Sequence, residues 1–142
     1  MKKAIFIGAI GCGKTTLIQR LDKLKISYNK TQTLEFYSNI IDTPGEYVEH
    51  RAIYSNLMTS AIDADVVVLM QSALDPRIVL PTGFSTMFTK PTVGIVTKID
   101  IATPDQVDLV KDRLIDAGAG KVFEVSAVTG KNVSEFTQYL QE

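Results

Sequence analysis

Residues 8–15 of this 142-residue chain read Gly-Ala-Ile-Gly-Cys-Gly-Lys-Thr, and no other stretch constrains the fold as strongly. They match the pattern G-x-x-x-x-G-K-[ST] in full. The apolar run at residues 4–8 leads into them, and residues 14–22 follow with apolar side chains at helical spacing. Glycines let consecutive backbone N–H groups turn inward around an anion, and a helix N-terminus adds unpaired donors. The sequence therefore predicts a strand, a phosphate-binding loop and a helix, in that order.

The residues of this loop have expected roles. The Lys14 ammonium can reach the β- and γ-phosphates of a nucleotide, and the Thr15 hydroxyl can bind Mg²⁺. We expect the nucleotide to be held by Gly8, Gly11, Cys12, Gly13, Lys14, Thr15 and Thr16. Cys12 occupies an unconstrained position of the loop. A redox role is the alternative for Cys12, because a helix N-terminus lowers the pKa of a thiol.

A second candidate motif is Asp42-Thr43-Pro44-Gly45, which follows an apolar pair at residues 40–41. A carboxylate at the end of a strand lies beside the phosphate loop in a doubly wound sheet, so Asp42 can hold Mg²⁺ directly or through water. Gly45 leaves its backbone N–H free to approach a γ-phosphate. Taken alone, the four residues are equally well explained by an ordinary turn. After a phosphate-loop motif, they predict contacts to Mg²⁺ and the γ-phosphate.

A third set of residues follows two later apolar runs and predicts a base site. Asp100 can accept hydrogen bonds from guanine N1–H and the 2-amino group, and adenine lacks both donors in that arrangement. The stem of Lys98, next to Thr97, can lie along the base. The backbone N–H of Ala127, after Ser126, is the other expected base contact. The alternative for residues 97–100 is a solvated loop that carries a charge pair.

Short apolar runs alternate with helical patterns along the whole chain. Strands are expected at residues 4–8, 36–42, 65–70, 92–97 and 121–125, and helices at residues 14–22, 46–61 and 132–141. A further helix starts at Thr103, because Thr103 can cap it and Gln106 completes a capping box, and it can end at Gly118 or Gly120. The pattern predicts an α/β fold, a doubly wound sheet of about six mostly parallel strands, in a single domain over residues 1–142.

The composition excludes several classes of protein. Lys and Arg number 15 and Asp and Glu number 16, so the formal net charge is −1 and a broad basic face for nucleic acid is not expected. No segment reaches the roughly 18 apolar residues of a membrane span. A single Cys excludes an internal disulfide framework and fits a reducing compartment. We therefore expect a cytoplasmic protein that binds neither nucleic acid nor membrane.

Taken together, these stretches resemble the small-GTPase branch of the P-loop NTPase fold over nearly the whole chain. More closely, the chain resembles the EutP/PduV family. The stretches that carry this resemblance are residues 6–8, 11–16, 30–32, 39–47 and 93–100. The resemblance implies a role in ethanolamine or propanediol utilisation and an association with bacterial microcompartments, whose shell or enzyme proteins are candidate partners. It also implies Mg²⁺ and GTP or GDP as cofactors, with ATP or ADP as the alternative.

Three features depart from the small-GTPase pattern. Thr97 stands where the usual base motif begins with Asn, and guanine is still expected because some small GTPases carry Thr there. Glu46 follows Gly45 where many relatives have a Gln that orients water, which predicts slow intrinsic hydrolysis or a need for a partner. The 27 residues of positions 15–41 are few for a helix, an effector loop and two strands. A truncated fold with a stunted second strand is therefore expected.

A threonine that senses Mg²⁺ is expected within that short segment. Thr31 is the expected residue, because Lys30-Thr31-Gln32 matches the family. Thr33 is the rival candidate. The remaining interpretation is that these are polar loop residues without a role.

Three functions fit these motifs. The leading one is a Mg²⁺-dependent guanine-nucleotide switch in which water attacks the γ-phosphate slowly, with Lys14, Thr31 and Gly45 at the reacting group. The second is a phosphotransferase that moves phosphate between ATP and a small acid such as acetate, an activity attached to the family. The third is a nucleotide-stabilised microcompartment scaffold with negligible turnover. Each function predicts a different result. The switch predicts a preference for GDP over ADP, the phosphotransferase predicts formation of acetyl phosphate, and the scaffold predicts nucleotide-dependent stability without turnover.

Overall fold

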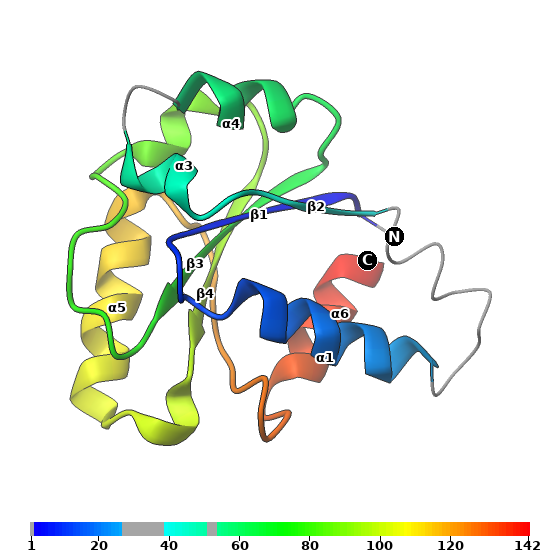
Figure 1. Ribbon diagram of the computed structural model, residues 1–142, viewed down its shortest axis with the longest axis vertical. Coiled ribbons are helices and arrows are strands. Elements are labelled where there is room, and N and C mark those ends of the chain that lie inside the picture. The colour runs from blue at the N-terminus through cyan, green and yellow to red at the C-terminus, as the bar shows by residue number, and fades with distance from the viewer. Residues whose placement is uncertain (1, 27–38, 51–53) are drawn as a thin grey trace.

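The computed structural model describes residues 2–26, 39–50 and 54–142 (Figure 1). A parallel sheet lies at its centre, with the strand order β2-β1-β3-β4-β5. Its strands are β1 (Ala4–Gly8), β2 (Ile40–Asp42), β3 (Val66–Ser72), β4 (Thr92–Thr97) and β5 (Val122–Glu124). The α/β class and the parallel sheet are confirmed. The described residues form five strands rather than about six, and residues 27–38 of the short segment before β2 lie outside the described ranges.

The chain reverses its direction across the sheet at β1. It passes from β1 to β2 on one side and then to β3 on the other side. Gly8 lies opposite Met70 on β3, and Ser72 at the end of β3 lies opposite Thr97 on β4. The loops that follow Gly8 and Thr97 therefore leave the same edge of the sheet, where doubly wound folds bind their ligands.

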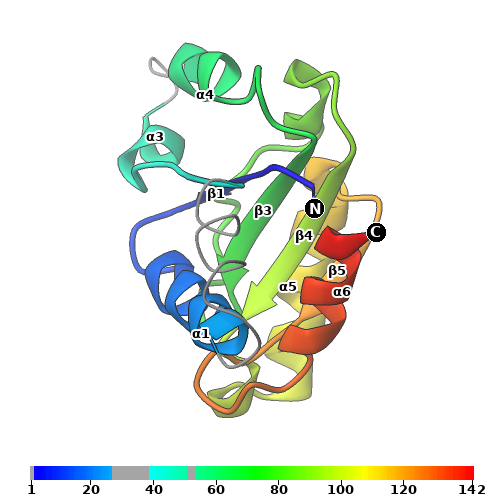
Figure 2. The same cartoon turned by 90° about the vertical axis from the view of Figure 1, so that its right-hand side faces the viewer.

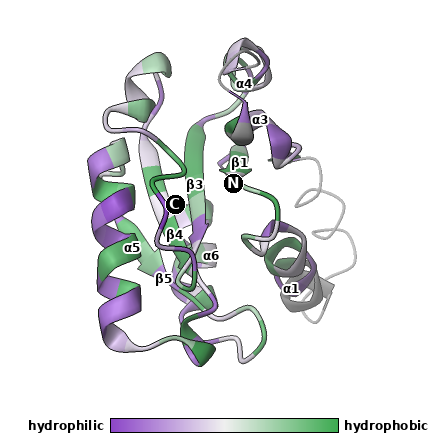
Figure 3. Cartoon of the chain, turned by 60° about the vertical axis from the view of Figure 1, so that its left-hand side comes forward, coloured by the Kyte–Doolittle hydropathy of each residue, from purple (hydrophilic) through white to green (hydrophobic). Residues whose placement is uncertain are grey.

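Helices cover both faces of the sheet (Figure 2). They are α1 (Lys14–Ile26) and α6 (Val133–Gln141) on one face, and α4 (Tyr54–Ser60) and α5 (Pro104–Ala117) on the other. Alternate residues of β1 serve the two layers, since Phe6 belongs to the apolar cluster under α1 and α6, and Ile5 and Ile7 belong to the other cluster. Figure 3 shows apolar strands at the centre and hydrophilic stretches on the outside of α5.

The segment after β2 differs from the single helix expected at residues 46–61. It forms α3 (Glu46–Glu49) and α4 (Tyr54–Ser60). His50 adopts an extended backbone with φ −131° and ψ 108°, which ends the first helix. The strand expected at residues 36–42 is described only as the three residues of β2. Two short 3₁₀ turns, η2 (Phe84–Met87) and η3 (Ile99–Ile101), flank β4.

The start of α5 confirms the expected capping box. The Thr103 hydroxyl accepts a hydrogen bond from the Gln106 N–H at 3.2 Å, and the Gln106 side chain accepts one from the Thr103 N–H at 2.9 Å. The helix ends at Gly118, whose φ of 116° lies in the left-handed region. Among the helices of the described ranges, none is long and apolar enough to cross a membrane.

Candidate functional site

The loop between β1 and α1 has the backbone conformation that an anion site needs. Gly11 and Gly13 have φ values of 83° and 98°, which a residue with a side chain rarely adopts. The Cys12 N–H donates to the Ala9 carbonyl at 3.1 Å and closes the turn. Helix α1 begins at Lys14, so its first-turn N–H groups, which lack intrahelical partners, come directly after the loop.

A cleft of about 500 Å³ opens beside this loop, a size typical of ligand sites. Its lining comes from three separate stretches of the chain: Ala9, Ile10, Gly11, Cys12, Gly13, Lys14, Thr15, Thr16, Asp42, Thr43, Pro44, Gly45 and Lys98. The structure thus brings the first two predicted motifs together with one residue of the third.

Lys14 lines the cleft, whereas Gly8 does not. The Lys14 side chain is 8% exposed, and its ammonium donates to the Gly8 carbonyl at 2.9 Å. Gly8 itself is buried beneath the loop and outside the lining of the cleft. A Cβ atom at Gly8 would lie 2.6 Å from the Cys12 Sγ and 2.7 Å from the Met70 carbonyl oxygen. The glycine is therefore needed for close packing under the loop.

The candidate Mg²⁺ ligands Thr15 and Asp42 are both exposed and line the cleft from α1 and β2. In the described ranges, no three His, Cys, Asp or Glu side chains gather into a metal-binding group. One hydroxyl and one carboxylate fit Mg²⁺, which is commonly bound by one or two protein oxygens together with waters and substrate phosphates. Thr31, the expected Mg²⁺-sensing residue, and its rival Thr33 lie outside the described residues.

The segment from Asp42 to Gly45 is fixed against the phosphate loop. The buried Thr43 hydroxyl donates to the Phe6 carbonyl at 2.7 Å. A Cβ atom at Gly45 would lie 2.5 Å from the Ile10 backbone nitrogen and 2.8 Å from the Ile10 Cα. Sequence reasoning did not identify Thr43 or Ile10 as site residues, because only the fold brings them against Phe6 and Gly45.

A second pocket of about 200 Å³ adjoins the cleft. It is lined by Gly13, Thr16, Thr97, Lys98, Asp100, Ile101, Ala127 and Val128. Four of the five residues predicted for the base site are in this lining. Gly13, Thr16 and Lys98 line both the pocket and the cleft, so the two spaces form one continuous surface.

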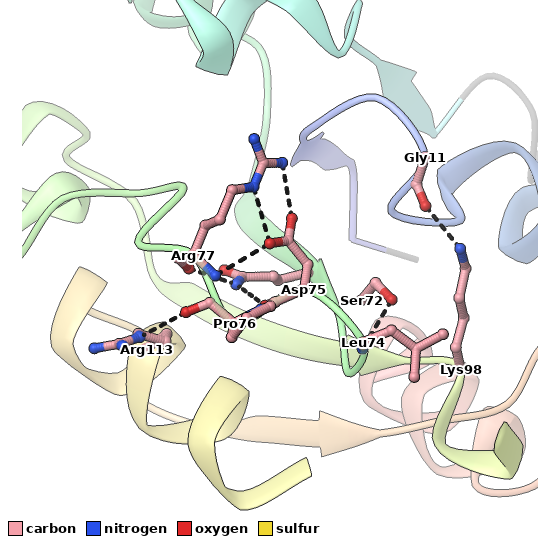
Figure 4. A network of polar contacts seen from close by, with 9 residues as sticks. Gly11, Ser72, Leu74, Asp75, Pro76, Arg77, Lys98 and Arg113 are labelled. Atoms are coloured by element: carbon pink, nitrogen blue, oxygen red, sulfur yellow. Dashed lines mark hydrogen bonds and ion pairs between the residues drawn. The ribbon is translucent and has the colours of Figure 1, made fainter. Parts of the chain in front are cut away.

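Thr97 and Lys98 contact the phosphate loop, which the sequence did not predict. The buried Thr97 hydroxyl donates to the Cys12 carbonyl at 2.5 Å. The Lys98 ammonium donates to the Gly11 carbonyl at 2.8 Å (Figure 4), from a backbone with a left-handed φ of 61°. These two side chains therefore tie the end of β4 to the loop after β1.

Ser126 is fully buried and is not part of the pocket lining. Its hydroxyl accepts a hydrogen bond from the Thr129 N–H at 3.1 Å. Its backbone N–H donates to the Lys131 carbonyl at 3.1 Å, and its carbonyl accepts from the Gly130 N–H at 2.8 Å. Ser126 thus shapes the loop from which Ala127 reaches the pocket.

The connection after β3 is fixed by its own polar contacts (Figure 4). The Asp75 carboxylate accepts hydrogen bonds from the Arg77 guanidinium at 2.9 and 2.8 Å, and these bonds hold the pKa of Asp75 below its usual value. The buried Gln71 side chain donates to the Asp75 and Arg77 carbonyls at 2.7 and 2.9 Å. These contacts order a connection to β4 whose one helical element is the short turn η2.

Cys12 is 4% exposed, and burial raises the pKa of its thiol, although the nearby charges of Lys14 and Lys98 act in the opposite direction. The thiol therefore keeps its proton at neutral pH. This environment favours simple occupancy of the loop position over a redox role, because the reactive form of a cysteine is the thiolate.

We expect iodoacetamide to alkylate native Cys12 at least about 10-fold more slowly at pH 8 than it alkylates the unfolded chain. The unfolded thiol loses its proton as the pH passes its ordinary pKa, while the native thiol retains it. Because the native thiol holds its proton more tightly than the unfolded thiol, Cys12 contributes to the free energy of unfolding. This contribution is complete below the ordinary pKa of a thiol and declines as the pH rises above that value. Mass spectrometry in buffer and in urea measures both rates, and equal rates would contradict the burial of Cys12.

Comparison with known proteins gives a family for the whole chain. The family described as "Ethanolamine utilisation - propanediol utilisation" matches residues 1–142. The propanediol utilization protein PduV of Citrobacter freundii is 41% identical over 140 residues, which cover 99% of this chain and 93% of the relative. The probable acetate kinase EutP of Escherichia coli (strain K12) is 33% identical over 143 residues, which cover 99% of this chain and 89% of the relative.

A shorter match connects the chain to a GTPase. GTPase Obg of Bdellovibrio bacteriovorus is 38% identical over 58 residues, which cover 41% of this chain and 17% of the relative. Together with the phosphate-loop motif and the parallel sheet, this match supports a P-loop NTPase fold. Since the family match spans every residue, the chain belongs to the PduV-EutP family of ethanolamine and propanediol utilisation proteins.

Proposed function

We propose that this protein is a Mg²⁺-dependent guanine-nucleotide switch that hydrolyses GTP slowly. The observation that carries the proposal is the continuity of the cleft and the pocket, which share Gly13, Thr16 and Lys98. A nucleotide on this surface would place its phosphates beside Lys14 and its base beside Asp100. We place this activity in the cytoplasm, in association with a bacterial microcompartment and its shell or enzyme proteins.

Each part of the site has a proposed task. The Lys14 ammonium and the loop N–H groups counter the negative charge of the phosphates. Asp100 accepts the guanine N1–H and 2-amino hydrogens, and the Ala127 N–H donates to the base. Thr15 and Asp42 would hold Mg²⁺, which when bound neutralises charge on the phosphate oxygens. The role proposed for Thr31 at the same ion belongs to a residue outside the described ranges.

Slow turnover follows from Glu46. This exposed residue is the first of α3 and comes directly after Gly45. An ionised carboxylate can accept a proton from water but cannot donate a hydrogen bond to a phosphate oxygen, and its charge repels the phosphates. Glu46 is therefore a poor substitute for a side chain that orients the attacking water, and a partner protein would be needed for fast hydrolysis.

Paired titrations with GDP and ADP in the presence of Mg²⁺ test the proposal. We expect GDP to bind more tightly, and Asp100→Ala to weaken GDP binding roughly 10- to 100-fold, because hydrogen bonds to a charged group contribute about 1.5–3 kcal/mol. Asp112→Ala, which removes an exposed carboxylate of α5 away from the site, is the matched control. Binding of ADP without binding of GDP would refute the switch.

A phosphotransferase is the second candidate, and one specific observation favours it. Relatives from Escherichia coli and Salmonella typhimurium that cover 99% of this chain are named probable acetate kinases. In that reaction an acetate oxygen attacks the γ-phosphorus of ATP, and acetyl phosphate and ADP leave. Formation of acetyl phosphate by the wild-type protein, and its loss in Lys14→Ala, would support this function. Nucleotide-dependent stability with neither activity would support a scaffold.

A further inference from the structure

An arginine of α1 packs on the loop that carries Ala127. Gly130 in this loop has a φ of 83°, and the guanidinium of Arg20 occupies the side on which a Cβ atom would stand. The Arg20 Cζ and Nε atoms lie 3.1 and 3.3 Å from that Cβ position, and Nη2 lies closer still. A residue with a side chain at position 130 would therefore be strained and would also displace Arg20.

The loop at residues 126–131 is closed on itself by hydrogen bonds. The Ser126 N–H donates to the Lys131 carbonyl at 3.1 Å, and the Gly130 N–H donates to the Ser126 carbonyl at 2.8 Å. These bonds fix the internal shape of the loop, but they do not connect it to α1. The contact between Arg20 and Gly130 makes that connection.

The contact of Arg20 depends on packing more than on hydrogen bonding by its Nε. The Nε atom is buried and has no hydrogen-bond partner within the described residues. A buried hydrogen-bond donor without a partner lowers the stability of the folded protein, so the burial of the Arg20 Nε needs an explanation. The explanation that the geometry offers is the position of the guanidinium between α1 and the loop.

We propose that Arg20 is a positioning residue for the nucleotide base. Helix α1 begins with Lys14 and Thr15 at the phosphate cleft, and Ala127 and Val128 line the base pocket. By holding Gly130 against α1, Arg20 fixes the distance between the phosphate cleft and the Ala127 N–H. This inference rests on the proposed nucleotide function and adds a residue that acts on the base without touching it.

The test compares a ligand that has a base with one that has none. We expect Arg20→Ala to weaken GDP binding about 10-fold and to change pyrophosphate binding less than about 2-fold, both measured by calorimetry with Mg²⁺. Arg113→Ala removes an arginine of α5 on the opposite face of the sheet and should leave both affinities unchanged. A merely structural role for Arg20 would alter both affinities together or only the melting temperature, and either result would overturn the proposal.

A double-variant cycle tests the contact itself. Gly130→Ala should weaken GDP binding in the wild-type background. The same change should cost less in the Arg20→Ala background, where the new methyl group meets no guanidinium. Strictly additive effects would argue against the proposed contact.

The outcome for the wild-type protein separates this inference from the proposed function. If the wild-type protein binds ADP and not GDP, the guanine switch is refuted. The role of Arg20 is then tested by whether Arg20→Ala weakens ADP binding more than pyrophosphate binding. If it binds pyrophosphate and no nucleotide, both proposals are overturned.

Discussion

Replacing Lys14 by Ala is expected to weaken GTP binding by more than about 30-fold, since truncating a buried charged partner costs roughly 2–5 kcal/mol. Lys14 is a buried residue that lines the cleft, and its ammonium donates to the Gly8 carbonyl at 2.9 Å. An ammonium has three donors, so it has capacity left for phosphate oxygens. No other Lys or Arg belongs to the phosphate loop itself. Calorimetric titration with Mg²⁺ and a slowly hydrolysed GTP analogue measures the effect.

The stability of this variant separates a binding defect from misfolding. Without nucleotide, Lys14→Ala should melt at the wild-type temperature or above it, because a buried ammonium is costly to desolvate. Lys111→Ala, which removes a lysine of α5 away from the cleft, should keep both affinity and melting temperature. Unchanged GTP affinity in a folded Lys14→Ala protein would refute the proposed phosphate site.

Gly45→Ala is expected to reduce the affinity for GTP relative to GDP by about 10-fold. The backbone at Gly45 has φ −59° and ψ −31°, which alanine adopts readily, so the effect does not arise from backbone strain. It arises because the new Cβ would lie 2.5 Å from the Ile10 backbone nitrogen. Neither segment can yield by rotating a side chain, so the Asp42–Gly45 segment must move off the phosphate loop.

The ratio of the two affinities is the informative measurement for Gly45. GDP lacks the γ-phosphate that the Gly45 N–H is proposed to contact, so its affinity should change little. Gly120→Ala is the matched control, because a Cβ there would meet only the Thr92 carbonyl oxygen at 3.7 Å. Equal losses for GTP and GDP would show that Gly45 does not distinguish the two nucleotides.

Several parts of the fold were predictable because their signals are local. The strand, phosphate loop and helix at residues 4–26 follow from an apolar run, three glycines and helical spacing within one stretch. The capping box at Thr103 and Gln106 depends on residues three positions apart. The alternation of such elements was sufficient to predict a parallel sheet covered on both faces.

Other parts were wrong or absent in the sequence prediction. A single helix was expected at residues 46–61, but the extended backbone of His50 ends α3 after four residues. Of the strand expected at residues 36–42, the structure describes only the three residues of β2, because positions 36–38 lie outside the described ranges. Propensity decides such boundaries weakly, since tertiary contacts override it.

By itself, the sequence determined the order of the elements and which residue types could bind phosphate, Mg²⁺ and a base. Only the tertiary structure decided how these groups meet: Thr97 donates to Cys12, Gly45 rests on Ile10, and Arg20 packs on Gly130. Thr97 and Cys12 are 85 positions apart. Such contacts depend on the register of β1, β3 and β4 and on how the helices pack against them, and neither leaves a pattern in any short stretch of the chain.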